Sequence, residues 1–252
     1  MNGLYVIAGA TGAIGKRLAL NIIERGGTPI LVGRSIDKLS SINDELNGQC
    51  PMIGDVDFSS PEEAGNKLTT ELKGETLSGM AYAVGSITLK PLRGCKVSDF
   101  LESYILNVVG AAEITKACLP GLKKGATHIG TSGIVFFSSI AAQSGLANHA
   151  VIGSSKAAVE GLTVSLAAEL APSGIRVNCV APSLTGGGSQ MARSMTDNEK
   201  LATALAATHP LNRLGMPADS ANAATYLLSH ELSSWTTGTI LPVDGGRSTI
   251  LK

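Results

Sequence analysis

The fold of this chain is decided by residues 4–34, which read LYVIAGATGAIGKRLALNIIERGGTPILVGR. The first five residues are apolar and end at a glycine, and an apolar run without alternation favours a strand that is covered on both faces. After Gly15, apolar residues recur at helical spacing until Gly26, and residues 28–32 form a second apolar run. The segment therefore predicts a strand, a glycine turn, a helix and a second, parallel strand.

Three glycines, Gly9, Gly12 and Gly15, stand where the first strand passes into the helix. Glycines at this place let the backbone turn tightly and approach a pyrophosphate, toward which the amide groups of the helix N-terminus point. An ordinary strand-to-helix turn can carry the same glycines. This turn, however, follows the first strand inside a strand–helix–strand unit, which is the context that a dinucleotide site requires. We therefore expect a dinucleotide to bind here.

The residues at the tip of the second strand are Gly33, Arg34 and Ser35. An acidic side chain there would accept hydrogen bonds from the ribose 2′-hydroxyl of NAD, whereas an arginine can pair with a 2′-phosphate. Gly33 occupies the acidic position and Arg34 follows it, so the sequence predicts NADP(H) as the cofactor. The alternative is that Arg34 is a solvent-exposed arginine without a ligand.

Strand-like and helix-like patterns alternate along the rest of the chain. The expected strands are 51–57, 77–84, 133–137, 175–180 and 239–243, and the expected helices are 36–46, a segment that begins at Ser60, 97–119, 150–170, 198–207 and 217–229. This alternation predicts a single α/β domain over residues 1–252. Its core would be a Rossmann-type, doubly wound parallel sheet of about seven strands, with helices on both faces and ligands at the carboxyl ends of the strands.

One long irregular excursion interrupts this pattern at residues 183–213. Excursions of this length are usually functional, so we expect a loop that covers the substrate. It contains Gln190, Met191 and Met195 but no group of charges that selects a substrate class.

The composition excludes several other classes of protein. The 20 Lys and Arg residues balance the 20 Asp and Glu residues and form no basic stripe, which argues against a nucleic-acid or anionic-membrane surface. Apolar runs are too short to span a bilayer, and no signal peptide is visible. The four cysteines and four histidines lack metal or redox spacing, so we expect free thiols, no metal site and a cytoplasmic protein.

With these segments placed, the chain from Gly9 to Gly246 resembles the short-chain dehydrogenase/reductase (SDR) family. The motifs that carry the resemblance are the glycine turn, Ser139 with Lys156 downstream, Arg176-Val177-Asn178 leading to Pro182, Arg213-Leu214-Gly215 before a helix, and Thr237-Gly238 before Asp244-Gly245-Gly246. Each motif alone is common, but their order and spacing together are specific. The resemblance implies an oxidoreductase that transfers hydride between NADP(H) and a small carbonyl or alcohol substrate.

The resemblance also assigns residues to the cofactor, with the glycine turn on its phosphates and ribose, the second strand's tip on the 2′-phosphate and Lys156 on the nicotinamide ribose. These residues are Gly9, Thr11, Gly12, Ile14, Gly15, Arg34, Ser35, Asp57, Phe58, Ala83, Gly85, Lys156, Pro182 and Thr185. The pair near the adenine is taken as Asp57 and Phe58, with Asp55 and Val56 as the alternative. Of the family's Asn-Asn-Ala-Gly segment, only Gly85 is present here.

Three further residues match the catalytic machinery of the family. Asn107 matches the asparagine that supports a water chain to the catalytic lysine, and Ser139 matches the serine that hydrogen-bonds the substrate carbonyl. The proton-donating tyrosine, four residues before Lys156, is replaced by Ile152, which can neither give nor take a proton. The substitute that we expect is His149, one helical turn earlier, with Ser139 or water as alternatives.

A second departure follows Pro182, where the family has a glycine and then a threonine that holds the nicotinamide carboxamide. Ser183 and Gly187 stand at those places, and Thr185 is the expected substitute. Three functions therefore remain open: an NADP(H)-dependent oxidoreductase with an altered proton donor, a non-catalytic NADP(H)-binding sensor or scaffold, and a structural subunit of a hetero-oligomer. The resemblance further implies a homo-oligomer, a dimer or a tetramer, assembled through the helices around Asn107 and Lys156.

Overall fold

The computed structural model describes residues 1–187 and 198–250. Its centre is a seven-stranded sheet in the order β3-β2-β1-β4-β5-β6-β7, in which every pairing is parallel. The strands are β1 (Leu4–Ala8), β2 (Thr28–Val32), β3 (Met52–Ile53), β4 (Leu77–Tyr82), β5 (Ser132–Phe137), β6 (Ile175–Pro182) and β7 (Ile240–Val243). The predicted α/β fold with a doubly wound parallel sheet is confirmed.

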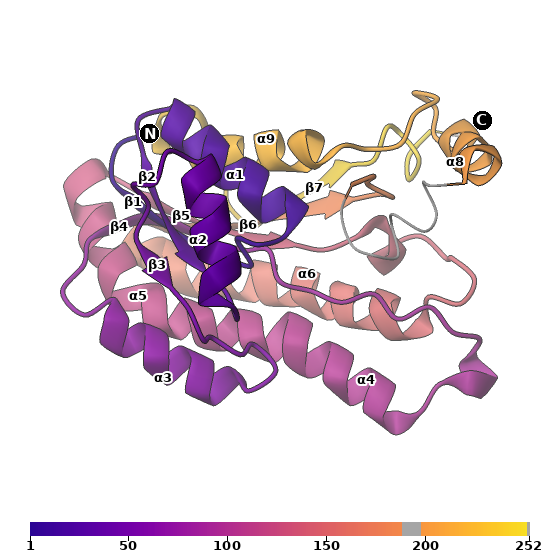
Figure 1. Cartoon of the computed structure of the whole chain (residues 1–252), viewed down its shortest axis with the longest axis horizontal. Helices are drawn as coiled ribbons and strands as arrows, with labels where there is room; N and C mark the ends of the chain where they lie inside the picture. The colour runs from indigo at the N-terminus through magenta and orange to yellow at the C-terminus, as the bar shows by residue number, and fades with distance from the viewer. Residues whose placement is uncertain (188–197, 251–252) are drawn as a thin grey trace.

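Helices cover both faces of this sheet. They are α1 (Ala13–Glu24), α2 (Ile36–Glu45), α3 (Pro61–Glu71), α4 (Val97–Tyr104), α5 (Gly110–Ile129), α6 (Ala150–Leu170), α8 (Glu199–Ala207), α9 (Pro217–Leu228) and α10 (His230–Ser233), with short turns of helix at η1 (Leu92–Gly94), η2 (Ile105–Val109), η3 (Ile140–Ala142) and η4 (Ala171–Ser173). Figure 1 shows α1, α2 and α9 on one face and α3, α4, α5 and α6 on the other.

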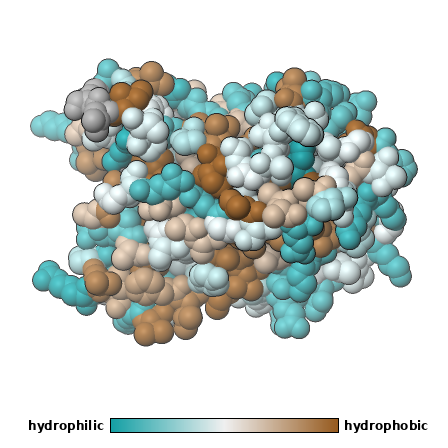
Figure 2. Space-filling model, turned by 180° about the vertical axis from the view of Figure 1, so that it is seen from behind, coloured by the Kyte–Doolittle hydropathy of each residue, from teal (hydrophilic) through white to brown (hydrophobic). Residues whose placement is uncertain are grey.

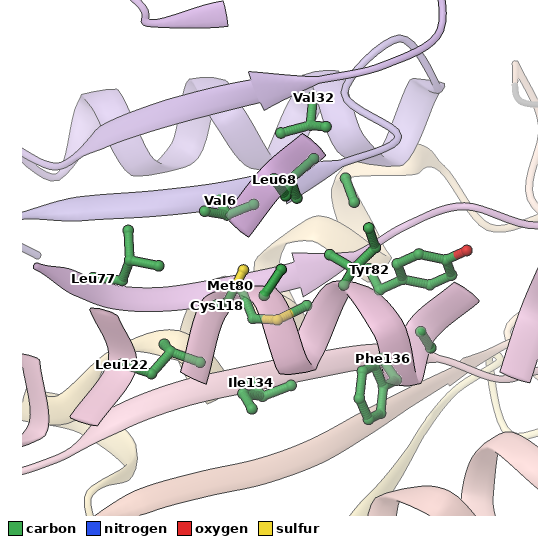
Figure 3. Packing of buried hydrophobic residues seen from close by; sticks show 14 of the residues in the cluster. Val6, Val32, Leu68, Leu77, Met80, Tyr82, Cys118, Leu122, Ile134 and Phe136 are labelled. Atoms are coloured by element: carbon green, nitrogen blue, oxygen red, sulfur yellow. The ribbon is translucent and has the colours of Figure 1, made fainter. Parts of the chain in front are cut away.

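The apolar run that forms β1 shows why a sheet covered on both faces needs no alternation. Val6 belongs to the core cluster shared with α3 and α5, whereas Tyr5 and Ile7 belong to the cluster shared with α1 and α9. Figure 3 shows the first of these clusters, with Val6, Met80 and Ile134 of three neighbouring strands close to side chains of the covering helices. Because successive strand residues point to opposite faces, both faces must be apolar.

The strand order places the expected ligand site. From β1 the chain proceeds outward to β2 and β3 on one side, and β4 returns to pair with the other side of β1. Connections that leave β1 and β4 at their carboxyl ends therefore diverge over opposite faces, and a crevice opens between them.

The third strand is shorter than the predicted segment 51–57, because its pairing ends after Ile53. Gly33 N donates to Ile53 O at 3.2 Å and Val56 N donates back to Gly33 O at 3.2 Å, while Asp55 between them has a φ of +51°. A left-handed residue turns the chain away from the sheet, and aspartate tolerates this conformation better than most residues. The alternation of the sequence could not reveal that turn.

The predicted helix 97–119 differs in two respects. It is interrupted by the π-helical turn η2, where the Tyr82 hydroxyl donates to Leu106 O at 2.7 Å, and it continues through Pro120 to Ile129. A Cβ at Gly121 would meet the Leu77 side chain at 2.7 Å, so α5 packs closely on β4. The remaining predicted elements agree with the structure to within two residues at their ends.

The combined helical stretch Val97–Ile129 is long and apolar enough to cross a membrane by length and composition alone. In the described structure, 56% of its most apolar window is buried within the molecule. Tertiary packing on β4 and β5 explains this apolar composition, because core helices of globular domains pass the same test.

Candidate active site

A cleft of about 1210 Å³ opens at the carboxyl ends of the strands. Its lining comes from the turn after β1, the segments after β4 and β5, the start of α6, the segment after β6, α8 and the turn after β7. Figure 2 shows the surface indented between the lobe that carries α8 and the lobe that carries α4. This volume suffices for a dinucleotide together with a small substrate, since pockets for drug-sized ligands alone occupy roughly 300–1,000 Å³.

The glycine turn has no room for side chains at two of its glycines. A Cβ at Gly15 would collide with the Gly9 carbonyl oxygen, and a Cβ at Gly9, which has a φ of +83°, would lie 2.9 Å from the Ala83 backbone. Gly12 begins α1, and no acidic residue lies in the first turn of that helix. Thr11, Gly12, Ile14 and Gly15 all line the cleft, so a helix N-terminus suited to an anion faces it.

Arg34 and Ser35 follow β2, outside the enclosed part of the cleft. Arg34 is exposed and forms no ion pair within residues 1–187 and 198–250. The Ser35 hydroxyl accepts a hydrogen bond from Lys38 N at 3.3 Å and thereby caps α2. A Cβ at Gly33 would lie 3.3 Å from Leu39, which leaves little space for an acidic side chain.

The two residues expected near the adenine face different surroundings. The Asp57 carboxylate accepts hydrogen bonds from the Ser59 hydroxyl at 2.7 Å and from Ser59 N at 3.0 Å, and these bonds lower its pKa. The Phe58 ring is buried in the core and meets Tyr82 edge-on with ring centres 5.8 Å apart. The structure therefore turns the Phe58 side chain away from the cleft and leaves Asp57 near the surface.

Lys156 and Asn107 come together beside Gly85. Lys156 Nζ donates to Phe137 O at 2.7 Å, and burial lowers the pKa of this lysine to about 8. Asn107 Nδ2 donates to Ser103 O at 2.8 Å, while its buried Oδ1 has no hydrogen-bond partner. A Cβ at Gly85 would lie 2.9 Å from that oxygen and 3.3 Å from Nζ, so only glycine fits between them. The orphaned oxygen is an acceptor that suits a bound water or ligand.

Ser139, Ile152 and His149 line the same cleft. Ser139 Oγ accepts from Ala141 N at 3.2 Å, which leaves its O–H free to donate to a substrate oxygen. His149 stands at the start of α6, and its Nδ1 donates to Ala147 O at 2.6 Å. This bond leaves Nε2 as the ring nitrogen that can exchange a proton. Ile152 is buried in the cleft wall and supplies only apolar surface.

The segment after β6 carries a polar group that sequence reasoning missed. Ser183 Oγ lies 2.8 Å from His209 Nε2 and 3.5 Å from Arg247 Nη1, and these three side chains form that group. Thr185, two residues after Ser183, lines the cleft, and its backbone pairs with that of Gly215. Arg247 follows the last expected strand. Because ligands bind at the carboxyl ends of parallel strands, this place in the sequence was the signal that could have identified Arg247 as a site residue. The predicted loop residues Gln190, Met191 and Met195 lie outside the described residues.

Comparison with known proteins gives consistent matches across the chain. A family model described as Enoyl-(Acyl carrier protein) reductase matches residues 9–248. Carbonyl reductase family member 4 of Danio rerio is 32% identical over 247 residues, which are 98% of each chain. The RhlG/NADP active-site complex of Pseudomonas aeruginosa has a TM-score of 0.88 at 26% identity, covering 98% of this chain and 96% of that one.

A second structure of similar fold has a reduced cofactor bound. It is a tyrosine-to-phenylalanine variant of ElxO with NADPH bound. Its TM-score is 0.87 at 26% identity, and the match covers 99% of this chain and 100% of that one. The family match, the curated relative and these folds agree, and the chain belongs to the short-chain dehydrogenase/reductase family of NAD(P)-dependent oxidoreductases.

Proposed function

We propose that this protein is an NADP(H)-dependent oxidoreductase that interconverts a small carbonyl compound and its alcohol, with a proton donor other than the family's tyrosine. The observation that carries the proposal is that Lys156 and Ser139 line one cleft, while the Asn107 amide lies beside Lys156 behind the lining residue Gly85. A purely structural subunit would not need a buried lysine and an unpartnered amide oxygen at the wall of a cleft, because both cost free energy of folding.

The residues present fit NADP(H). At Gly9 and Gly15 a single Cβ would meet the backbone of the glycine turn or of its neighbour, so glycine keeps the turn open. The amide groups of this turn can bind the pyrophosphate. Arg34 is exposed and would pair with the 2′-phosphate, and by the family resemblance Asp57 would contact the adenine. Lys156, Pro182 and Thr185 line the cleft, and by the family resemblance Lys156 would donate to the nicotinamide ribose while Pro182 and Thr185 would hold the carboxamide. The bound cofactor supplies or accepts the hydride.

The protein's own residues would handle the substrate oxygen. In the reductive direction the carbonyl carbon gains a hydride and the oxygen gains a proton, which gives the alcohol. Ser139 would orient the carbonyl by donating a hydrogen bond, and His149 Nε2 would give the proton. General acid catalysis is worth about 10²- to 10⁴-fold, or roughly 3 to 5.5 kcal/mol of barrier, so turnover depends on how well His149 replaces the tyrosine.

A second candidate function is an NADP(H)-binding sensor or scaffold without turnover. Ile152 favours it, because the cleft wall has no acid at the usual place. The ElxO variant has NADPH bound although one of its tyrosines is replaced by phenylalanine, so in that relative cofactor binding does not need that hydroxyl. Binding and turnover must be tested separately for this reason.

We further propose a cytoplasmic, single-domain protein that acts as a homodimer or homotetramer. Val97 on α4 is 75% exposed and Leu101 is 56% exposed, and Trp235 after α10 is 99% exposed. Figure 2 shows apolar side chains gathered on the lobe of α4. Exposed apolar residues gathered in this way on α4 are typical of subunit contacts, and Trp235 marks a separate exposed apolar position.

The first test is a titration of the purified protein with NADPH and with NADH, by calorimetry or nicotinamide fluorescence. We expect micromolar affinity for NADPH and much weaker affinity for NADH. The Arg34→Asp variant should lose most of that preference, whereas Lys38→Gln, which removes an exposed positive charge from the first turn of the helix that follows Arg34, should keep it. Absence of binding by either nucleotide would contradict both the oxidoreductase and the sensor.

A further inference from the structure

Arg247 is a cation at the cleft wall for which residues 1–187 and 198–250 supply no counter-ion. Its side chain makes one hydrogen bond with these residues, from Nη1 to Ser183 Oγ at 3.5 Å, and none of their carboxylates lies within ion-pair distance. The nearest acid in sequence, Asp244, is bound by Gly246 N at 2.9 Å and Ser248 N at 2.8 Å. Most donors of the guanidinium are therefore left for a ligand.

Ser183 is held in place by a buried histidine. His209 Nδ1 lies 2.9 Å from Leu205 O and donates to it, so its Nε2 accepts the Ser183 hydroxyl at 2.8 Å. The Ser183 oxygen can then accept from Arg247. This arrangement fixes the hydroxyl beside the guanidinium but contributes no negative charge, so the described residues leave the charge of Arg247 uncompensated.

The other cations of the cleft wall are engaged elsewhere. Lys16 pairs with Glu45, which is the sole carboxylate among the described lining residues, and Arg17 lies 3.7 Å from Glu24. Lys156 donates to the Phe137 carbonyl, which supplies no negative charge, but the ribose of the proposed cofactor would cover this lysine. Among the described residues, a substrate anion beyond the cofactor would therefore find its counter-charge at Arg247.

The position of Arg247 separates it from the phosphates of the proposed cofactor. It follows β7, and β7 is four strand positions away from β1, which carries the glycine turn. At about 4.8 Å between neighbouring strands, the lateral separation is about 19 Å. Apolar side chains from Leu146, Leu184 and Leu205 line the cleft as well. Among the described lining residues that follow β6 and β7, Arg247 is the cation, and Leu184 and Leu205 add apolar surface beside Ser183 and Thr185.

We propose that Arg247, with Ser183 beside it, binds a carboxylate of the substrate, so that the substrate is an oxo acid or hydroxy acid with an apolar body. One uncompensated guanidinium matches one monoanion, and its planar fork fits a carboxylate by two parallel hydrogen bonds. The inference rests on the proposed function, because it assigns the substrate class of the same site.

The test is a binding measurement that needs no turnover. The protein saturated with NADP⁺ is titrated by calorimetry with para-formylbenzoate and, separately, with its neutral methyl ester. We expect the wild type to bind the carboxylate roughly ten-fold or more tightly than the ester. Arg247→Gln should abolish this preference with unchanged affinity for NADP⁺, and Arg247→Lys should keep only part of it because the planar fork is lost.

Arg25→Gln is the matched control, because it removes an exposed arginine at the far end of α1 and should keep the preference. Equal affinity of the wild type for the two compounds, no binding of either, or an unchanged preference in Arg247→Gln would overturn the proposal. Failure to bind NADP⁺ would instead contradict the proposed function. In that case the wild type and Arg247→Gln are titrated with the same two compounds in the absence of cofactor. A preference of the wild type for the carboxylate that Arg247→Gln lacks would support the carboxylate site, and equal affinities for the two compounds would overturn it.

Discussion

The two sides of the cleft differ in how closely they follow the SDR pattern. On the side of β1 and β4, the glycine turn and Gly85 occupy places where a Cβ would collide with its surroundings. On the side of β5, β6 and β7, the wall carries Ile152 in place of the tyrosine and Ser183 in place of a glycine. The first side is constrained by backbone packing, whereas the second is formed by side chains that can change without disturbing the fold.

This difference teaches that cofactor binding and proton transfer are separable properties of the molecule. The glycine turn is needed for the packing of α1 against β1 whether or not chemistry occurs. A side chain in the cleft wall, such as Ile152, can differ between relatives without altering the backbone of the turn that would bind the cofactor. The following predictions test whether the two sides are independent in this way, from the largest expected effect to the smallest.

The largest effect is expected from Gly15→Val on the β1 side. The new side chain would collide with the Gly9 carbonyl and displace the turn, so NADPH affinity should fall by about 100-fold or more, and the free energy of unfolding should decrease by a few kcal/mol. Calorimetric titration and thermal unfolding measure the two quantities. In contrast, Gly161→Ala in α6 meets no atom within 4 Å and should leave affinity unchanged. An unchanged affinity in Gly15→Val would show that the cofactor does not bind at this turn.

The next effect concerns the other side of the cleft. Ile152→Tyr should raise the rate of carbonyl reduction by tens of fold or more, because it returns an acid worth about 10²- to 10⁴-fold to a site that keeps Ser139 and Lys156. Single-turnover oxidation of NADPH with an aldehyde panel measures the rate. Ile152→Phe supplies the ring without the hydroxyl and should not accelerate the reaction. Equal rates in Ile152→Tyr and Ile152→Phe would mean that the cleft is not arranged for hydride transfer.

His149→Ala tests the proposed donor within that side. Removal of His149 Nε2 should lower turnover about ten-fold or more while NADPH affinity stays the same. The control is His128→Ala, because His128 is an exposed histidine of α5 whose Nδ1 also bonds a backbone carbonyl, that of Lys124 at 2.7 Å. Undiminished turnover in His149→Ala would exclude this histidine and leave Ser139 or water as the proton source.

The last effect, and the smallest for a change of one pH unit, is a pH dependence of the free energy of unfolding that arises from Lys156, between the two sides of the cleft. Burial lowers the pKa of Lys156 from 10.5 to about 8, so between these values the unfolded chain keeps a proton that the folded protein releases. The free energy of unfolding of the wild type should therefore rise with pH over this window relative to Lys156→Met, by up to about 1.4 kcal/mol per pH unit. Urea unfolding between pH 8 and pH 10 measures the difference.

Cys179 is the titratable group that interacts with Lys156, so the same comparison is repeated in a Cys179→Ala background. Parallel stability curves for the wild type and Lys156→Met in both backgrounds would contradict the lowered pKa of this lysine.

The local elements follow from sequence patterns because their causes are local. The bounds Leu4–Ala8, Thr28–Val32 and Ala150–Leu170 were all predicted, since runs of apolar residues and helical spacing are read within a few turns of chain. The differences between the predicted and the observed bounds of β3 and of the helix after η1 have tertiary causes. The left-handed Asp55 ends β3, and the Tyr82 hydroxyl bonds Leu106 O across 24 residues of sequence within the π-helical turn.

The sequence by itself determined the parallel α/β sheet, the glycine turn after β1 and the exchange of tyrosine for Ile152, because each is written in consecutive or regularly spaced residues. Only the tertiary structure decided which distant side chains meet. Ser183 joins His209 across 26 residues and Arg247 across 64, and Asn107 comes beside Lys156 through the packing of α4 and η2 on α6. Such meetings depend on how the sheet aligns its strand ends, which no local pattern of residues encodes.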